Sequence, residues 1–231
     1  AVAEGRLDEA DVYARAQEVV DMALAATQQP DGGSYDEDAH HELATRVAAE
    51  SITLLRNEGG LLPLGAATRV ALIGDMAETP RYQGAGSSQV NPTRLDRAYD
   101  LLAAGGARAR GLVLEGYAPG YARHGGTTDA LLAEARDVAA RADVALVYVG
   151  LDELAESEGL DRPHMRLPDG QAELIEAVVR ANPKTVIILS GGASVEMPWA
   201  ERVPALVHAH LGGQGGAGAV LNVLTGAVNP S

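Results

Sequence analysis

The amino-acid sequence predicts an α/β protein, a three-layer αβα sandwich with a mainly parallel sheet. Short apolar runs rich in Val, Ile and Leu are typical of strands that are buried on both faces. These runs span residues 69–74, 112–117, 144–150, 184–189 and 205–210. Helical patterns of roughly 10–15 residues separate most of the runs, and this alternation favours βαβ units with helices on both faces of one sheet.

The helical patterns consist of apolar residues that recur with the spacing of one helix face. They predict helices over residues 93–104, 127–141, 170–181 and 217–225. Two more helices are expected before the first strand, at 7–26, where Asp8 can cap the first turn, and at 38–57. Residues 27–37, TQQPDGGSYDE, have the composition of a linker between these two helices.

Composition narrows the class of protein. The 231-residue chain has a formal net charge of −14, and this acidic balance argues against nucleic acid and an anionic membrane as partners. It has no cysteine, which excludes disulfides, thiolate catalysis and cysteine metal sites. No apolar run is long enough to predict a membrane span, and the first residues read like the middle of a protein, without a targeting segment. The composition fits either side of a membrane.

One loop carries most of the candidate chemistry. About 18 residues, 152–169, follow the strand at 144–150, whereas strand-to-helix loops usually have about 2–6 residues. Its first part, residues 152–162, holds five carboxylates and one guanidinium, those of Asp152, Glu153, Glu156, Glu158, Asp161 and Arg162. Ligands of open α/β sheets bind at the carboxyl ends of the strands, so we interpret this loop as the active element.

The alternative is a charged loop that is merely solvated. Two details favour the active element. Gly159 follows Glu158, so the backbone there can adopt a positive φ or pass close to a ligand. Asp161 and Arg162 are adjacent and can hold the loop in shape by a charge-assisted hydrogen bond.

A second long loop, residues 75–92, follows the first predicted strand and contains QGAGSSQ at 83–89. The side chains of Gln83, Ser87 and Ser88 offer neutral donors and acceptors. Such groups suit a polyhydroxyl ligand, whereas a phosphate site would need a lysine or a helix N-terminus. The alternative is an ordinary loop of glycine and serine. We expect this loop to lie beside residues 152–169.

Two other patterns suggest rival chemistry. GQGGAG, residues 213–218, matches the G-x-G-x-x-G dinucleotide fingerprint, although close packing between helix and strand explains the glycines equally well. His208 and His210 alternate along one strand, so they form either a metal pair or satisfied core histidines. No G-x-S-x-G segment is present, which argues against a serine hydrolase.

Several segments together resemble glycoside hydrolase family 3, the β-glucosidase and β-xylosidase family. ELATRVAAESITLLRNEGGLLPL, YQGAGSSQV, ESEGLDRPHMRLPDGQ, GGASVEMPW and LGGQGGAGAVLNVLTGAVNPS each resemble family segments in the same order. The resemblance implies that residues 38–231 are the C-terminal (α/β)6 sandwich domain without its last strand. It also implies that residues 1–26 are the terminal helix of a preceding barrel domain and that 27–37 link the two.

The resemblance further implies a retaining glycosidase that works with two carboxylates and cleaves a β-linked glycoside. It assigns the general acid/base to Glu158, with Glu156 as the alternative. The family nucleophile is an aspartate of the barrel in a Ser-Asp-Trp context, which is absent here because the only tryptophan, Trp199, follows Pro198. The expected partner is therefore a barrel domain in cis or in trans, with a possible homo-oligomer. No metal ion or cofactor is implied.

Two other functions are alternatives to this one. The first is a nucleotide-binding α/β module that uses the glycine motif at 213–218. The second is a non-catalytic domain that serves sugar binding or assembly, in which Glu158 would be dispensable.

Overall fold

The computed structural model describes residues 1–28 and 32–231, and it divides into two compact units, Ala1–Glu37 and Asp38–Ser231. The first unit holds helix α1, Glu9–Thr27, whose predicted cap is confirmed because Asp8 accepts a hydrogen bond from the Ala10 N–H (2.9 Å). No residue of α1 is buried. The predicted linker at 27–37 includes residues 29–31, which lie outside the described residues.

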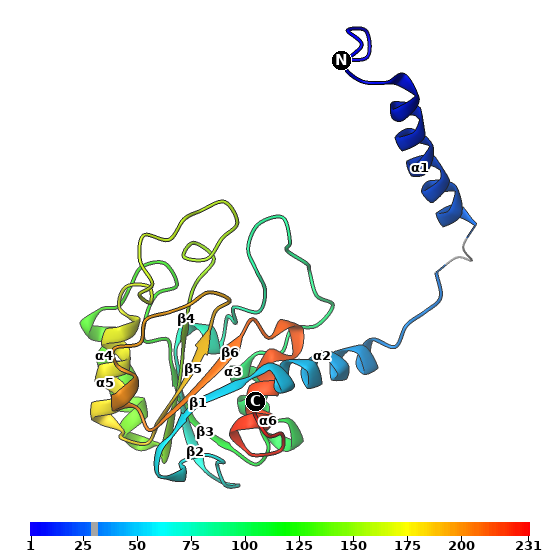
Figure 1. Cartoon of the computed structure of the whole chain (residues 1–231). Helices are drawn as coiled ribbons and strands as arrows, with labels where there is room; N and C mark the ends of the chain where they lie inside the picture. The colour runs from blue at the N-terminus through cyan, green and yellow to red at the C-terminus, as the bar shows by residue number, and fades with distance from the viewer. Residues whose placement is uncertain (29–31) are drawn as a thin grey trace. The chain divides into compact units, whose positions relative to one another are not determined.

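The second unit is built on a six-stranded sheet with the order β1-β6-β5-β4-β2-β3 (Figure 1). Its strands are β1 (Thr53–Asn57), β2 (Arg69–Ile73), β3 (Val113–Ala118), β4 (Val144–Gly150), β5 (Thr185–Ser190) and β6 (Ala205–His210). All neighbouring pairs are parallel except β1 with β6. The predicted α/β class with a mainly parallel sheet is therefore confirmed.

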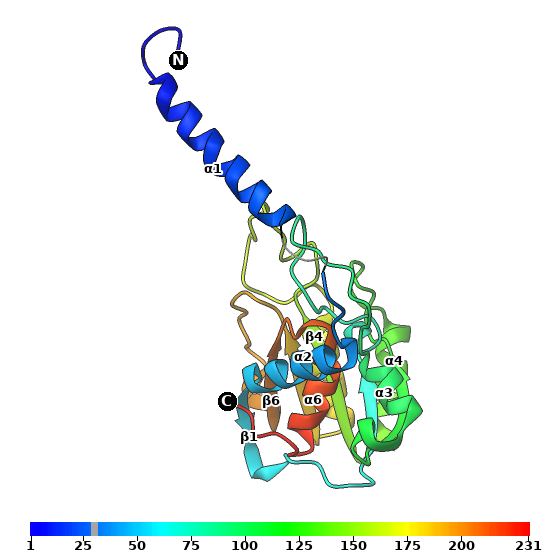
Figure 2. The same ribbon diagram turned by 90° about the vertical axis from the view of Figure 1, so that its right-hand side faces the viewer.

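Helices cover both faces of this sheet. They are α2 (Glu37–Ser51), α3 (Ala98–Ala104), α4 (Asp129–Arg141), α5 (Gln171–Ala181) and α6 (Gly216–Leu224). Helices α4 and α5 lie together on one face, and α2, α3 and α6 lie on the other (Figures 1 and 2). None of the helices in the described residues is long and apolar enough to span a membrane.

Strand β4 lies in the interior of the sheet, between β5 and β2, and every one of its residues is buried. Its unbroken apolar sequence suits a strand that is covered by helices on both faces. The surrounding core is mainly aliphatic, with Trp199 and Tyr121 as its largest fully buried side chains. The core therefore fixes the carboxyl end of β4, where the long loop 152–169 begins.

The predicted helix at 38–57 is wrong in its last turns. Helix α2 ends at Ser51, and Thr53–Asn57 form the edge strand β1, which pairs antiparallel with β6. The segment that changes conformation, ITLL, contains two β-branched residues, which lower helix propensity and raise strand propensity. Pairing with the free edge of β6 satisfies the backbone of the segment, so tertiary contacts override the helical spacing.

The predicted helix at 93–104 also starts too early, because α3 begins only at Ala98. The preceding residues are held away from a helix by a buried side chain. Asp96 lies 3.0 Å from Nε2 of His41 on α2, and its backbone N–H donates to the Gln214 carbonyl (2.9 Å). These contacts bind the segment before α3 to α2 and to the loop before α6.

The side chain of Gln171 completes the hydrogen bonding of β4 at its carboxyl end. Strand β2 stops at Ile73, so the N–H and C=O of Gly150 on that side of β4 find no strand partner. The side chain of Gln171, the fully buried first residue of α5, takes the place of the missing strand. Its Oε1 accepts from Gly150 N–H (2.8 Å), and its Nε2 donates to Gly150 O (3.0 Å). Buried backbone groups need such partners.

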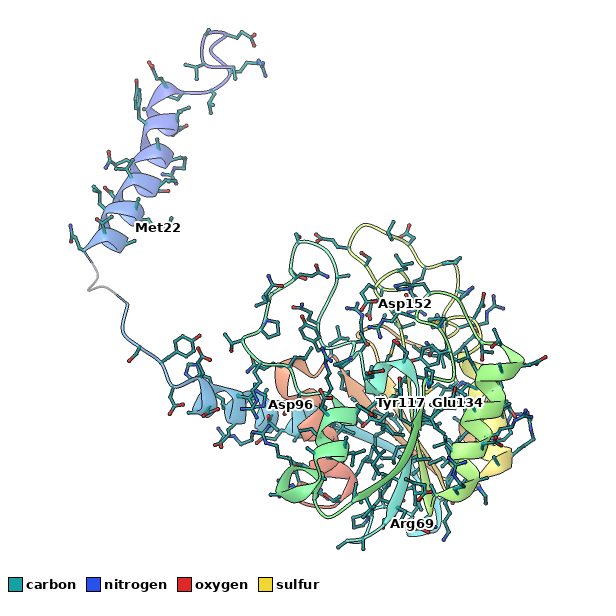
Figure 3. The ribbon with its side chains drawn as sticks, turned by 180° about the vertical axis from the view of Figure 1, so that it is seen from behind. Met22, Arg69, Asp96, Tyr117, Glu134 and Asp152 are labelled. Carbon is teal, nitrogen blue, oxygen red and sulfur yellow. The ribbon has the colours of Figure 1, made fainter. Side chains whose placement is uncertain are left out.

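The opposite, amino-terminal end of the sheet carries an exposed ionic contact. The carboxylate of Asp143 accepts the backbone N–H of Arg69 (2.9 Å) and lies 3.3 Å from its guanidinium. Figure 3 shows Arg69 at the end of the sheet that lies away from Asp152. The backbone hydrogen bond from Arg69, followed by the bond from its side chain, holds the pKa of Asp143 below its ordinary value.

Replacing Gln171 by leucine should destabilise the fold, because it leaves the N–H and C=O of Gly150 buried without partners. We expect a loss of about 2–5 kcal/mol in the free energy of unfolding, measured by urea denaturation. The matched control is Glu173→Leu on the exposed side of the same helix, for which a change within about 0.5 kcal/mol is expected. Equal effects of the two substitutions would contradict this account.

Acidification should remove the contribution of Asp143. Because its pKa is lower in the folded state, the stabilisation is present above the unfolded pKa of about 3.9 and is lost as the pH falls through the folded pKa. The unfolding free energy of Asp143→Asn should therefore depend less on pH below about 4 than that of the unsubstituted chain. Asp137→Asn, at an exposed position of α4, is the control and should retain the original pH dependence.

Candidate active site

The two long loops lie side by side at the carboxyl ends of β2 and β4. Because these strands are parallel neighbours, the segments that follow them emerge at the same edge of the sheet. Two hydrogen bonds join the loops: Arg81 Nη2 donates to the Glu156 carbonyl (2.9 Å), and Ser87 Oγ donates to Glu158 Oε2 (2.8 Å). The predicted proximity of residues 75–92 and 152–169 is therefore confirmed.

Asp152 shapes the first turn of the loop after β4 (Figure 3). Its buried carboxylate accepts the backbone N–H groups of Leu154 (3.0 Å) and Ala155 (2.7 Å). Its other oxygen lies 3.1 Å from Nδ1 of His124, which belongs to the segment between β3 and α4. The turn is thus closed by a side chain, as is common for aspartate in irregular backbone.

Arg123, from the same segment as His124, clamps the starts of both long loops. Its guanidinium donates to Asp75 Oδ2 (2.8 Å) and to the Thr79 carbonyl (2.6 Å) of the first loop. It also makes a two-pronged contact with the carboxylate of Glu153 (2.7 and 3.2 Å) in the second loop. Burial alone would raise the pKa of Glu153, but the hydrogen bonds and charge of Arg123 hold that pKa below its ordinary value.

Glu156 is turned into the protein. Its two carboxylate oxygens lie 2.9 and 3.0 Å from the backbone N–H of Gly192, which follows β5, and Oε2 lies 3.9 Å from Arg81 Nη2. A Cβ atom on Gly192 would lie only 2.8 Å from Glu156 Oε1, so a side chain there would displace this carboxylate. Glu156 therefore connects the loop after β4 to the loop after β5.

Glu158, by contrast, is exposed. Its carboxylate accepts the Ser87 hydroxyl and lies against Gly86, where an added Cβ would be 3.4 Å from both its Cβ and its Oε2. The absence of a side chain at Gly86 leaves room for the carboxylate to approach the first loop. A carboxylate that is held on one side and open on the other can reach a ligand.

Among the residues expected to shape the loop, Arg162 has a different partner from the one expected. Gly159 has a φ of +77°, which is one of the two possibilities that its lack of a side chain allows at this position. Arg162 donates to the carbonyl oxygen of Ser194 (3.1 Å) and forms no ion pair with Asp161 among the described residues. The loop after β5 runs close to this segment, and its backbone is the better partner for Arg162.

Of the predicted sugar-binding residues, Gln83 is occupied within its own loop. Its Nε2 donates to the Val90 carbonyl (2.9 Å), and its Oε1 accepts the Val90 N–H (2.9 Å). The amide thus closes the loop of residues 83–90. Ser87 contacts Glu158, and Ser88 is exposed beside it.

A shallow depression with a volume of about 340 Å³ lies between the loops. Glu156, Glu158, Asp161 and Arg162 all contribute to it, so the structure brings together four of the predicted residues. The remaining lining residues are Gly84, Ala85, Ala155, Ser157, Leu160, Ala193 and Leu211.

The sequence patterns do not single out Arg81 and Arg123, the two arginines that hold these loops. Arginine is common in this chain, and no local pattern marks these two.

The glycine motif at 213–218 serves packing. A Cβ on Gly215 would lie 2.2 Å from Thr45 Oγ1 and 2.8 Å from the Thr45 backbone, so α2 approaches this loop at the distance of a bare backbone. Gln214 Nε2 lies 3.0 Å from His41 Nδ1, which also ties the motif to α2. The close approach at Gly215 supports the packing alternative over the nucleotide site, whereas an added Cβ at Gly213 or Gly216 would meet no atom within 4 Å.

The rings of His208 and His210 contact each other, with their centroids 3.9 Å apart and their planes tilted by 37°. Nε2 of His208 lies 3.1 Å from the Gly191 carbonyl oxygen. Burial, with a smaller effect of His210, lowers the pKa of His208 below its ordinary value. Among the described residues, no group of three or more His, Asp or Glu side chains is arranged to hold a metal ion.

Comparison with known proteins identifies the family. The chain is 44% identical over its whole length to the thermostable β-glucosidase B of Acetivibrio thermocellus and 38% identical to an exo-α-(1→6)-L-arabinopyranosidase of Bifidobacterium breve. It superimposes on a GH3 β-glucosidase of Bifidobacterium adolescentis with a TM-score of 0.88 and 38% identity, covering 99% of this chain. The chain spans only 30%, 31% and 33% of these three proteins. Residues 52–231 match the glycosyl hydrolase family 3 C-terminal domain, and the chain therefore belongs to that family.

Proposed function

We propose that this chain is the second domain of a retaining β-glycosidase and that Glu158 is the general acid/base. The observation that carries the proposal is the position of Glu158 at the edge of a depression formed by the loops after β2, β4 and β5. Its carboxylate is exposed and is held on one side by Ser87. A general acid must reach the leaving-group oxygen within hydrogen-bond distance, and an open carboxylate can do so.

Geometry favours Glu158 over Glu156 for this role. Both oxygens of Glu156 face the Gly192 N–H, and the side chain is largely buried beside Arg81. To protonate a substrate, Glu156 would have to leave these partners. Glu158 loses only the contact with Ser87, which a sugar hydroxyl can replace.

The reaction needs a second carboxylate. In retaining glycosidases the acid/base and the nucleophile stand about 5–5.5 Å apart on either side of the scissile bond. Glu158 protonates the leaving oxygen while the nucleophile attacks the anomeric carbon. It then removes a proton from the water that hydrolyses the glycosyl-enzyme. We propose that the nucleophile is an aspartate of a barrel domain whose terminal helix is residues 1–26, with 27–37 as the linker to residues 38–231.

The proposed substrate is a terminal β-linked glycoside, with a β-glucoside as the first choice. The support is the 44% identity to a β-glucosidase over the whole of this chain. The Ser87 hydroxyl donates to Glu158, and Ser88 is the next residue along the chain. We assign both hydroxyls to contacts with the sugar. Gln83 contributes by closing their loop.

Without the nucleophile, the chain of residues 1–231 should not hydrolyse an aryl β-glucoside. Adding a matching barrel domain, in cis or in trans, should produce turnover, because the two carboxylates would then flank the same bond. With a nitrophenyl β-glucoside as the substrate, the release of nitrophenol measures this turnover directly. Sustained turnover by residues 1–231 alone would place the nucleophile within the chain and contradict the assignment of a shared site.

In the full-length enzyme, Glu158→Gln keeps the size of the side chain but removes the proton donor. Hydrolysis of substrates with poor leaving groups should fall by about 10²–10⁴-fold, the usual contribution of general acid catalysis. An activated aryl glucoside should still form the glycosyl-enzyme, which then accumulates because no base activates water. Azide needs no base, so it should restore turnover and give a β-glucosyl azide, detected by mass spectrometry and NMR.

Two substitutions serve as controls for this experiment. Asp161→Asn removes another carboxylate that lines the same depression and should show no azide rescue. Glu156→Gln tests the alternative acid/base. Azide rescue of Glu156→Gln together with near-normal activity of Glu158→Gln would transfer the role to Glu156, and rescue of neither would refute the role of this loop.

A further inference from the structure

The buried guanidinium of Arg81 links the two loops of the candidate site. Its side chain is 2% exposed, although Arg81 belongs to an irregular loop and not to a strand or helix. A buried charge is costly unless it is paired and hydrogen-bonded. The Nε atom of Arg81 is buried without a hydrogen-bond partner, so the charge is satisfied only through its two Nη atoms.

Each Nη atom binds a different loop. Nη1 donates to the carbonyl oxygen of Gln83, and Nη2 donates to the carbonyl oxygen of Glu156 (2.9 Å). Nη2 also lies 3.9 Å from the carboxylate of Glu156, which itself binds Gly192. A single side chain therefore holds the backbones of the loops after β2 and β4 and contacts the residue that reaches the loop after β5.

The two residues whose carbonyls Arg81 binds lie shortly before Ser87 and Glu158 in the sequence. Glu156 precedes Glu158 by two residues, and Gln83 lies at the start of the short loop that presents Ser87. The Ser87 hydroxyl then donates to Glu158 (2.8 Å). Any shift at Arg81 would move both partners of this contact, and misplacement of a reacting group by about 1 Å can reduce the rate by about 10²-fold.

We propose that Arg81 is a positioning residue that holds Glu158 in the orientation needed for proton transfer. The proposal rests on the proposed function of Glu158. Arg81 touches no reacting atom, and it acts through the peptide groups of Gln83 and Glu156. Loss of Arg81 should therefore weaken acid/base catalysis selectively and leave the attack of the nucleophile intact.

The test compares leaving groups in the full-length enzyme. For Arg81→Met, kcat/KM should fall by about 10–10²-fold for a phenyl β-glucoside, whose leaving group needs protonation. For the 2,4-dinitrophenyl β-glucoside, which needs no acid, kcat/KM should change by less than about 3-fold. Azide should raise kcat of Arg81→Met with the dinitrophenyl substrate, because a misplaced base also slows attack by water.

A purely structural role predicts a different pattern. Lower stability would reduce kcat/KM by the same factor for every leaving group, since it reduces only the amount of active enzyme. A uniform loss in folded Arg81→Met, or no loss, would overturn the proposal. Arg81→Lys keeps the charge but cannot donate to both carbonyls in the same geometry, so it should show the same selectivity at smaller magnitude. It carries the test if Arg81→Met does not fold.

Arg123→Met is the matched control. Arg123 is also a largely buried guanidinium that bridges the same two loops, but it binds their first residues, Asp75 and Glu153. Asp152 still closes the turn that follows, so the position of Glu158 should depend less on Arg123. We expect reduced stability with little leaving-group selectivity. If Arg81→Met and Arg123→Met show equal leaving-group selectivity, the position of Glu158 depends on both arginines alike. That result would overturn a specific role for Arg81.

Glu158→Gln, measured in parallel, separates this inference from the proposed function. If Glu158→Gln shows neither leaving-group selectivity nor azide rescue, the assignment of the acid/base fails. If Glu158→Gln shows both and Arg81→Met shows neither, Glu158 keeps its role and only the positioning role of Arg81 fails.

Discussion

The parallel pairing of β2 with β4 is the constraint on which the candidate site depends. It brings the ends of two strands to one edge of the sheet, and the loops that leave this edge are 75–92 and 152–169. The pairing is secured by the complete burial of β4 between two helical layers. Because a buried strand cannot shift its register without exposing apolar side chains or breaking its hydrogen bonds, the loops begin at fixed points.

Long loops have few backbone hydrogen bonds of their own, and here charged side chains take over that role. Arg123 and Asp152 hold the first residues of the loops, and Arg81 and Glu156 hold the next ones. The clamps use backbone carbonyls and N–H groups as partners at least as often as charged side chains. This arrangement leaves Glu158 as a carboxylate of the same loop that is open to a ligand.

The family relationship and the geometry support each other at different levels. Membership in glycosyl hydrolase family 3 rests on the match of residues 52–231, whereas the choice between Glu156 and Glu158 rests on their contacts. Identity to relatives does not by itself distinguish two glutamates separated by a single residue. Their contacts differ, because the Gly192 N–H binds Glu156 and not Glu158.

The sequence alone determined the α/β class, the burial of β4 and the existence of a charged loop after it, because apolar periodicity and loop length are local properties. Its local patterns could not place Thr53–Asn57 in a strand, since the partner of that strand, β6, lies far along the chain. They also could not reveal the partner of Arg81, which is 75 residues away at Glu156, or that Arg162 binds Ser194 instead of Asp161. Only the tertiary structure decides such contacts, because they depend on which chain segments the sheet order brings together.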